Sequence, residues 1–190
     1  MQGTIIVVDD NKGVLSAVKL LLKNSFERII TLTSPITLPA VLREENAQVV
    51  LLDMNFSSGL NTGNEGLYWL HEIKKMQPSL PVVLFTAYAD IDLAVRGIKE
   101  GAADFIVKPW DNEKLIQTLV HVWEHRMESN TDKASSVAES LINALLKKYT
   151  EAYAKPLPRL TAEAVDKLSD MAGRGDLALL QQIVERTVLL

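Results

Sequence analysis

Five polar residues in the first 110 positions have the types and the spacing of a site that handles phosphate. An acidic pair, a further aspartate, a threonine and a lysine come at or just after the ends of short apolar runs: Asp9, Asp10, Asp53, Thr86 and Lys108. Carboxylates gathered in one pocket repel one another and hold their protons unless a cation compensates them. A divalent metal and a lysine supply that positive charge, which also attracts a phosphoryl group. The five residues therefore predict metal-assisted transfer of a phosphoryl group onto a carboxylate.

The apolar runs before these residues predict strands of a parallel sheet. Each run is short and rich in β-branched residues, which suits strands that are buried on both faces. In an open α/β sheet the ligand lies at the carboxyl edge of the strands, so residues far apart in sequence meet there. The runs that carry the site are residues 4–8, 49–52, 81–85 and 104–107.

The chemistry of each residue predicts its role. Asp10 and Asp53 suit Mg²⁺, because the chain has no cysteine and no histidine near these positions. Asp9 is expected to act on the metal indirectly, without being one of its direct ligands. Asp53 is the expected nucleophile, because it follows the central strand. Lys108 is expected to neutralise a phosphoryl oxygen or to hold Asp53, and the Thr86 hydroxyl to hydrogen-bond the phosphoryl group.

Composition excludes several classes of protein. Apolar residues make up 47% and charged residues 23% of the 190, which is close to the globular average and supplies enough side chains for a core. A formal net charge of −4 and the lack of a basic stripe argue against direct binding to DNA. The apolar runs are too short to cross a bilayer and no signal peptide begins the sequence, so we expect a cytoplasmic protein that does not bind membranes.

Strand-like and helix-like segments alternate from residue 4 to about residue 126, which predicts βαβ units. The predicted strands are residues 4–8, 28–32, 48–52, 81–85 and 104–107, and the predicted helices are residues 12–24, 35–45, 65–76, 90–99 and 111–126. Asp90 and Asp111 suit the N-cap positions of the last two helices. A polar stretch over residues 127–136 predicts a linker, and residues 137–190 predict a small all-α module.

Four motifs together resemble the receiver domain of bacterial two-component response regulators. They are Asp9-Asp10 after Ile-Ile-Val-Val, Asp53 after Val-Val-Leu-Leu, Thr86-Ala87 after Val-Val-Leu-Phe, and Lys108-Pro109 after Asp-Phe-Ile-Val. The resemblance covers residues 3–126 and implies a receiver domain over residues 1–126. It also implies a doubly wound, flavodoxin-like α/β fold with five parallel strands in the order 2-1-3-4-5.

The resemblance implies how the acidic residues act. Asp53 matches the residue that a sensor histidine kinase phosphorylates. Asp10, Asp53 and the backbone carbonyl of Asn55 match the ligands of Mg²⁺. The loop that follows, residues 54–64, is longer and more polar than is usual in receivers and looks like that of a subset of NtrC-like regulators. Asn55 and Tyr88, two positions past Asp53 and Thr86, border the path of attacking water and are expected to tune the lifetime of the phosphoryl group.

The resemblance also implies a switch. Thr86, Lys108 and the Ala87 backbone match groups that bind the phosphoryl group, and Thr86 and Phe105 match a pair that moves on phosphorylation. In the family the hydroxyl turns toward the phosphoryl group and the aromatic ring moves inward, which changes a surface corresponding to residues 90–126. A cis peptide bond between Lys108 and Pro109 is expected to aim the lysine.

Residues 141–190 resemble the helical lid of the AAA+ domain in NtrC-class enhancer-binding activators. The resemblance is carried by Leu-Leu-Lys-Lys-Tyr at 145–149, Leu-Thr-Ala-Glu-Ala at 160–164 and the final segment from Gly-Asp-Leu-Ala-Leu-Leu onward. Ala178 stands where that lid carries a nucleotide-sensing arginine, and the chain has no G-x-x-x-x-G-K-[ST] loop. We therefore expect no ATP binding and no ATPase activity, and interpret the module as a remnant used for packing.

Three functions remain open from the sequence. The first is a phosphorylation-controlled switch that receives its phosphoryl group from a sensor histidine kinase and controls a homodimer or binding to a related regulator. Such a protein has at most self-phosphorylation and self-dephosphorylation activity. The second is a non-switching scaffold or decoy for a kinase or a full-length regulator. The third is a truncated transcriptional activator that lacks its ATPase and DNA-binding parts.

Overall fold

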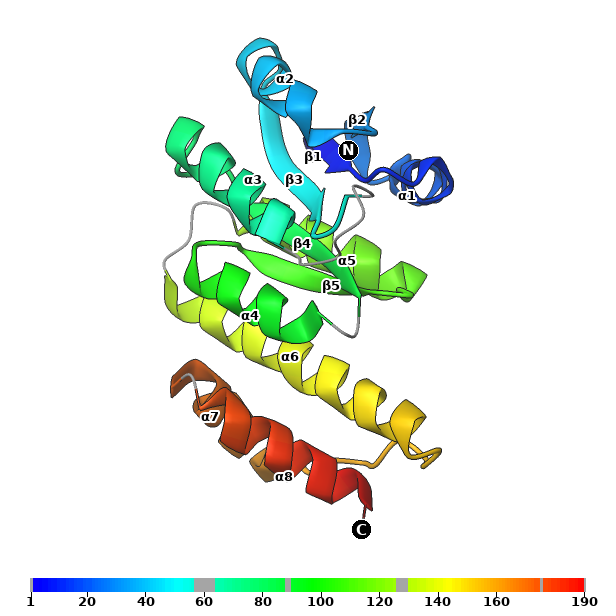
Figure 1. Cartoon of the computed structure of the whole chain (residues 1–190), viewed down its shortest axis with the longest axis vertical. Helices are drawn as coiled ribbons and strands as arrows, with labels where there is room; N and C mark the ends of the chain where they lie inside the picture. The colour runs from blue at the N-terminus through cyan, green and yellow to red at the C-terminus, as the bar shows by residue number, and fades with distance from the viewer. Residues whose placement is uncertain (1, 57–63, 88–89, 126–129, 175, 190) are drawn as a thin grey trace. The chain divides into compact units, whose positions relative to one another are not determined.

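The computed structural model describes residues 2–56, 64–87, 90–125, 130–174 and 176–189. The backbone forms two compact units, Met1–Glu128 and Ser129–Leu190. The first unit is a β-sheet covered by helices, and the second is a group of three helices (Figure 1).

The sheet of the first unit has five parallel strands, and their order confirms the predicted fold class. The strands are β1 (Gln2–Val8), β2 (Phe26–Leu32), β3 (Ala47–Asp53), β4 (Val82–Ala87) and β5 (Asp104–Lys108). They lie in the order β2-β1-β3-β4-β5, and every neighbouring pair is parallel. The direction of winding reverses between β1 and β3, so the carboxyl ends of these two strands flank the crevice where α/β sheets bind ligands.

Helices cover both faces of the sheet, which explains why the strands are apolar on both sides. The helices are α1 (Lys12–Leu22), α2 (Leu38–Glu44), α3 (Asn64–Met76), α4 (Ile91–Lys99) and α5 (Asn112–Glu124). On one face α1 and α5 bury the strand residues Ile5, Val7, Val49, Leu51, Val83 and Phe85. On the other face α3 lies against β3, and α4 lies against β4 and β5. The alternate strand residues that point to this face are fully buried as well: Ile6, Val8, Val50, Leu52 and Leu84.

Capping side chains fix where two of these helices begin. Asn11 accepts hydrogen bonds from Gly13 N and Val14 N at the start of α1. Asp111 accepts one from the backbone N–H of the third residue of α5, which confirms that predicted cap. Asp90 also occupies its predicted N-cap position, at the start of α4, but its side chain makes no capping bond with that helix and accepts a hydrogen bond from Asn55 instead.

The single helix predicted over residues 35–45 is two elements. A 3-10 turn, η1 (Pro35–Thr37), comes first and α2 follows it. A continuous α-helix would need the N–H of residue 39 to donate to the carbonyl of residue 35, and Pro39 has no N–H. Proline is tolerated in the first turn of a helix, so a new helix starts at Leu38.

The second unit consists of α6 (Asn130–Ala152), α7 (Ala162–Arg174) and α8 (Leu177–Leu189), which pack against one another. The large apolar side chains that they bury are Leu141, Ile142, Leu145, Leu146, Leu168, Leu180, Val184 and Val188. Helical backbone begins inside residues 127–136, the stretch predicted as a linker, because a helix anchored by apolar side chains farther along propagates into polar sequence. Among the described helices, none combines the length and apolar content that crossing a membrane requires.

Gly66 allows the start of α3 to approach the end of β3. A Cβ atom at Gly66 would lie 2.6 Å from the Met54 Cα and 3.0 Å from the Asp53 carbonyl oxygen. Gly66 N donates to the Met54 carbonyl oxygen at 3.2 Å. These neighbours are backbone atoms, which cannot move aside as the end of a flexible side chain can. The backbone at Asp53 and Met54, at the end of β3, can therefore lie this close to α3 only if residue 66 is glycine.

Gly66→Ala is expected to lower the free energy of unfolding by about 1–3 kcal/mol, the usual cost of overpacking, in urea denaturation. The control is Gly13→Ala in the first turn of α1, where a Cβ would meet only the end of the Asn11 side chain, at 3.1 Å. That control is expected to change stability by less than about 1 kcal/mol. Equal losses in the two variants would show that the approach of α3 does not depend on Gly66.

Candidate functional site

The five residues with predicted chemistry meet at the carboxyl edge of the sheet. They are Asp9 and Asp10 directly after β1, Asp53 at the end of β3, Thr86 in β4 and Lys108 at the end of β5. Strand pairing keeps these ends level, since Asp53 pairs with Phe85 and Lys108 pairs with Ala87. The parallel sheet thus brings together residues that are up to 99 positions apart.

Lys108 is the centre of this cluster. Its Nζ lies 2.6 Å from Asp9 Oδ2 and 2.9 Å from Asp53 Oδ1. Asp9 is fully buried and Asp53 is 5% exposed. The same Nζ lies 4.6 Å from the centroid of the Phe85 ring, which in turn packs against Trp110 with 5.2 Å between ring centroids. One cation therefore serves two buried carboxylates, and the cluster keeps an excess of negative charge.

Burial and neighbouring charges shift the pKa of Asp53 and of Lys108. Burial raises the pKa of Asp53 from 3.8 to about 6, although the charge and hydrogen bond of Lys108 lower it, and the charge of Asp9 adds to the rise. For Lys108, burial lowers the pKa, but the hydrogen bonds and charges of Asp9 and Asp53 outweigh burial and raise it. Lys108 is therefore charged at neutral pH. Burial and the charge of Asp9 oppose the ionised form of Asp53, and a second cation near its carboxylate would stabilise that form.

Three carboxylates of the cluster could hold a metal ion. One oxygen from each of Asp9, Asp10 and Asp53 lies within 4.8 Å of the others. Asp10 is only half-buried, whereas the other two are buried. A set of oxygen donors suits a hard divalent cation such as Mg²⁺. The donor set and the raised pKa of Asp53 both fit such a cation.

Backbone N–H groups orient two of the carboxylates. Asn11 N donates to Asp9 Oδ1 and Met54 N donates to Asp53 Oδ1, each at 2.9 Å. A backbone hydrogen bond from Asn55 lowers the pKa of Asp53. The sequence reasoning missed Asn11, although an asparagine directly before a helical pattern is a capping signal.

The residues expected to respond to phosphorylation are interior. Thr86 is 1% exposed and Phe105 is 3% exposed. The Thr86 hydroxyl donates a long hydrogen bond, 3.4 Å, to the Ala87 carbonyl oxygen. The peptide bond between Lys108 and Pro109 is cis.

A hydrogen bond joins the segment after β3 to the start of α4. Asn55 Nδ2 donates to Asp90 Oδ2 at 2.8 Å. The sequence gives no signal for this pair, because the two residues are 35 positions apart and lie in different loops. Two other predicted features, Tyr88 and residues 57–63 of the long loop, lie outside the described residues.

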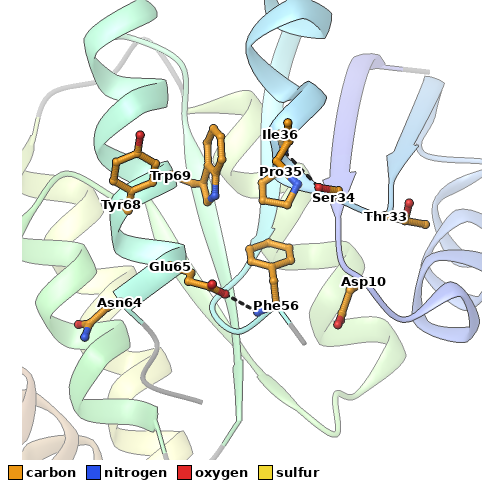
Figure 2. Close-up of a pocket in the computed structure, with 10 residues that line it drawn as sticks. All are labelled: Asp10, Thr33, Ser34, Pro35, Ile36, Phe56, Asn64, Glu65, Tyr68 and Trp69. Atoms are coloured by element: carbon orange, nitrogen blue, oxygen red, sulfur yellow. Dashed lines mark hydrogen bonds between the residues drawn. The ribbon is translucent and has the colours of Figure 1, made fainter. Parts of the chain in front are cut away.

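A cavity of about 730 Å³ opens beside Asp10 (Figure 2). Its other lining residues come from the segment after β2, the segment after β3 and the start of α3: Thr33, Ser34, Pro35, Ile36, Phe56, Asn64, Glu65, Tyr68 and Trp69. The Phe56 N–H donates to Glu65 Oε2 at 3.3 Å, which fixes one wall. The acidic cluster therefore borders open space on the side of Asp10.

A model of one protein family, the response regulator receiver domain, matches residues 5–120. This range contains all five residues of the cluster.

Curated proteins that the chain resembles are transcriptional regulators. The chain is 33% identical over 124 residues to the transcriptional regulatory protein ZraR of Klebsiella oxytoca, covering 65% of this chain and 27% of that protein. It is 28% identical over 127 residues to the DNA-binding transcriptional regulator NtrC of Salmonella typhimurium, covering 67% of this chain and 26% of that protein. The chain spans about a quarter of the length of these relatives.

Solved structures of receiver domains resemble the first unit. The N-terminal signal receiver domain of a two-component system response regulator from Bacteroides fragilis is 70% identical, with a TM-score of 0.60, and the match covers 65% of this chain and 98% of that chain. The receiver domain of NtrX from Brucella abortus is 32% identical, with a TM-score of 0.57, and the match covers 63% of this chain and 98% of that chain.

Asp53→Asn is expected to raise the free energy of unfolding at pH 7.5, without divalent ions, by about 1–2 kcal/mol. The pKa of Asp53 is higher in the folded protein, at about 6, than its ordinary value. The folded state therefore holds the proton more tightly, and the stability that this gives is present below pH 4 and lost as the pH rises through 6. Urea denaturation in EDTA between pH 4 and pH 8 measures the difference between variant and wild type.

This difference is expected to grow up to about pH 6 and then to level off. Asp92→Asn is the control, since Asp92 is an exposed carboxylate in the first turn of α4. If the wild type instead became more stable than the Asp53 variant as the pH rises from 4 to 8, the raised pKa of Asp53 would be contradicted.

Proposed function

This chain belongs to the response regulator receiver domain family, and we propose from that premise that Asp53 accepts a phosphoryl group from a sensor histidine kinase. As a receiver domain the protein is a phosphoacceptor rather than a classical enzyme. The observation that carries the proposal is the position of Lys108, within hydrogen-bonding distance of both Asp9 and Asp53 at the carboxyl edge of the sheet.

In the proposed reaction Asp53 is the nucleophile. One oxygen of its carboxylate forms a bond to phosphorus while the bond from phosphorus to the histidine nitrogen of the kinase breaks, and the imidazole leaves with its electron pair. With a pKa of about 6, Asp53 is mostly ionised at neutral pH, as a nucleophile must be. Lys108 Nζ offsets negative charge on the transferred group. The Thr86 hydroxyl and the Ala87 backbone N–H are proposed to hydrogen-bond the phosphoryl oxygens.

We assign Mg²⁺ as the cofactor, held by Asp10, Asp53 and the backbone carbonyl of Asn55. The clustering of the three carboxylates supports this assignment. Asp9 contributes indirectly, because it is fully buried and bonded to Lys108 and to Asn11 N. When bound, the ion would supply positive charge beside the Asp53 carboxylate, which would offset both the charge of the transferred group and the burial that raises the pKa of Asp53.

The proposed output is a change in the surface formed by α4, β5 and α5. Thr86 turns toward the phosphoryl group and the ring of Phe105, which is already buried, repacks beside it, and the new surface controls homodimerisation or binding of a related regulator. The support is that both residues are buried on adjacent strands, since packed interiors pass on displacements. Asn55 and Tyr88 are proposed to set the lifetime of the phosphoryl group.

We propose that the second unit is a packing module similar to the AAA+ lid of NtrC-class activators, without ATP binding or direct DNA binding. The support for the likeness is the sequence motifs of residues 141–190, and the support for a packing role is that α6, α7 and α8 pack against one another. A role in transcription regulation would then act through a partner. The proposal places the protein in the cytoplasm, with the kinase domain that it receives phosphate from.

Incubation with a small-molecule phosphodonor and Mg²⁺ is expected to add one phosphoryl group, detected by intact mass spectrometry. Asp53→Asn is expected to remain unlabelled, because an amide cannot form the acyl phosphate. Asp92→Asn is the matched control and is expected to be labelled as fully as wild type. Equal labelling of wild type and the Asp53 variant, or labelling of neither, would favour the scaffold function instead.

Mg²⁺ at about ten times its dissociation constant is expected to stabilise the wild type by about 1.4 kcal/mol, because the ion binds only the folded protein. Asp10→Asn is expected to lose most of this gain, because it removes the half-buried carboxylate of the cluster. Thermal unfolding with and without Mg²⁺ measures the effect, with Asp111→Asn as control, which alters a carboxylate outside the group of three and keeps a side chain that can cap α5. An equal gain in the Asp10 variant would argue against the proposed ligands.

A further inference from the structure

The hydrogen bond from Asn55 to Asp90 ties two neighbouring loops at the carboxyl edge. Asn55 Nδ2 lies 2.8 Å from Asp90 Oδ2, and both residues are half-buried. One residue follows β3 and the other directly precedes α4. Because the acceptor is a carboxylate, this bond is stronger than one between neutral side chains.

Asp90 stands where an aspartate ordinarily caps its own helix. It is the N-cap residue of α4, yet its side chain accepts no bond from the amides of that helix. Asp111, at the N-cap of α5, accepts from Lys114 N at 2.9 Å. The same residue type at the same helix position is thus used differently in one chain. The carboxylate of Asp90 serves Asn55 in place of α4.

Asn55 is placed to pass this restraint on to the phosphoacceptor. It lies two residues after Asp53, and the intervening Met54 N donates to Asp53 Oδ1 at 2.9 Å. The backbone of Asn55 also makes a hydrogen bond that lowers the pKa of Asp53. When the side chain of Asn55 is held in place, the backbone of Met54 and Asn55 is held as well. This backbone orients the Asp53 carboxylate through its N–H groups, and it carries the Asn55 carbonyl that is proposed to bind Mg²⁺.

We propose that Asp90 is a positioning residue for this site: by holding the Asn55 side chain, it sets the backbone at Asn55 for Mg²⁺ binding. The inference rests on the proposed function. It adds a residue that contacts neither the ion nor the phosphoryl group. It also links the site to α4, because release of Asn55 frees the Asp90 carboxylate to accept from the amides of its own helix.

Asp90→Ser separates positioning from capping. Serine is a good N-cap for α4 but is too short to reach Asn55 Nδ2. In the full chain, Mg²⁺ affinity is followed by tryptophan fluorescence, since Trp110 packs on Phe85 beneath Lys108. The expected loss is about tenfold, the lower end for groups that support a metal ligand. Asp90→Asn, which keeps an acceptor oxygen, is expected to restore part of the affinity, and Asp92→Asn to stay within about twofold of wild type.

A double variant tests whether the two side chains act together. Asn55→Ala is expected to weaken Mg²⁺ binding about as much as Asp90→Ser, and the double variant no more than either, because both remove the same bond. An unchanged affinity in Asp90→Ser would overturn the inference and assign Asp90 to helix capping alone. Losses that multiply in the double variant would overturn it as well, because they would show independent effects.

A measurement without metal separates this inference from the proposed function. In EDTA, hydrogen exchange at the Asn55 amide is expected to be faster in Asp90→Ser than in wild type, because the tether is lost. The Met54 amide, which also donates to the Phe85 carbonyl oxygen at 3.0 Å, serves as the internal reference. Unchanged exchange would overturn the positioning role. Failure of the wild type to be phosphorylated at Asp53 would overturn the proposed function while leaving this exchange difference intact.

Discussion

The ammonium group of Lys108 lies between the buried carboxylates of Asp9 and Asp53, and the rest of the site is arranged around this shared ion pair. Charges removed from water are costly unless they are paired and hydrogen-bonded. The ends of β1, β3 and β5 must therefore stay level, so that one lysine reaches both carboxylates. The parallel sheet provides this, and the backbone donors Asn11 N and Met54 N complete the coordination of the two anions.

The positive charge of Lys108 does not balance the negative charge around it, because this one cation pairs with two carboxylates, Asp9 and Asp53. The excess negative charge, together with burial, holds the pKa of Asp53 near 6. A site with this balance gives up stability in exchange for the capacity to take up a divalent cation and a phosphoryl group. The apolar wall of Phe85 and Trp110 strengthens these interactions, because it keeps water from one side of the lysine.

The sequence predicts a strand or a helix cap correctly where the interactions that form it involve residues close together in the chain. The apolar runs gave strands that the structure confirms, and Asp111 caps α5 because the capping bond spans only three residues. The structure departs from the local expectation where a more distant or a more specific constraint acts. Pro39 divides the segment over residues 35–45, and Asp90, although it holds its predicted N-cap position, bonds to Asn55 and not to the amides of α4. A propensity for capping cannot show that a partner 35 residues away competes for the same carboxylate.

The sequence by itself determined the identity and the approximate place of the acidic cluster. Alternating apolar and helical segments imply a parallel sheet, and a parallel sheet gathers the residues at its carboxyl edge whatever the details of packing. Only the tertiary structure decided which carboxylates share Lys108, how deeply Asp9 and Asp53 are buried, and that Asn55 is tied to Asp90. These features depend on distances of about 3 Å between side chains from separate loops and strands, and such distances are set by how the whole domain packs rather than by any local pattern of residues.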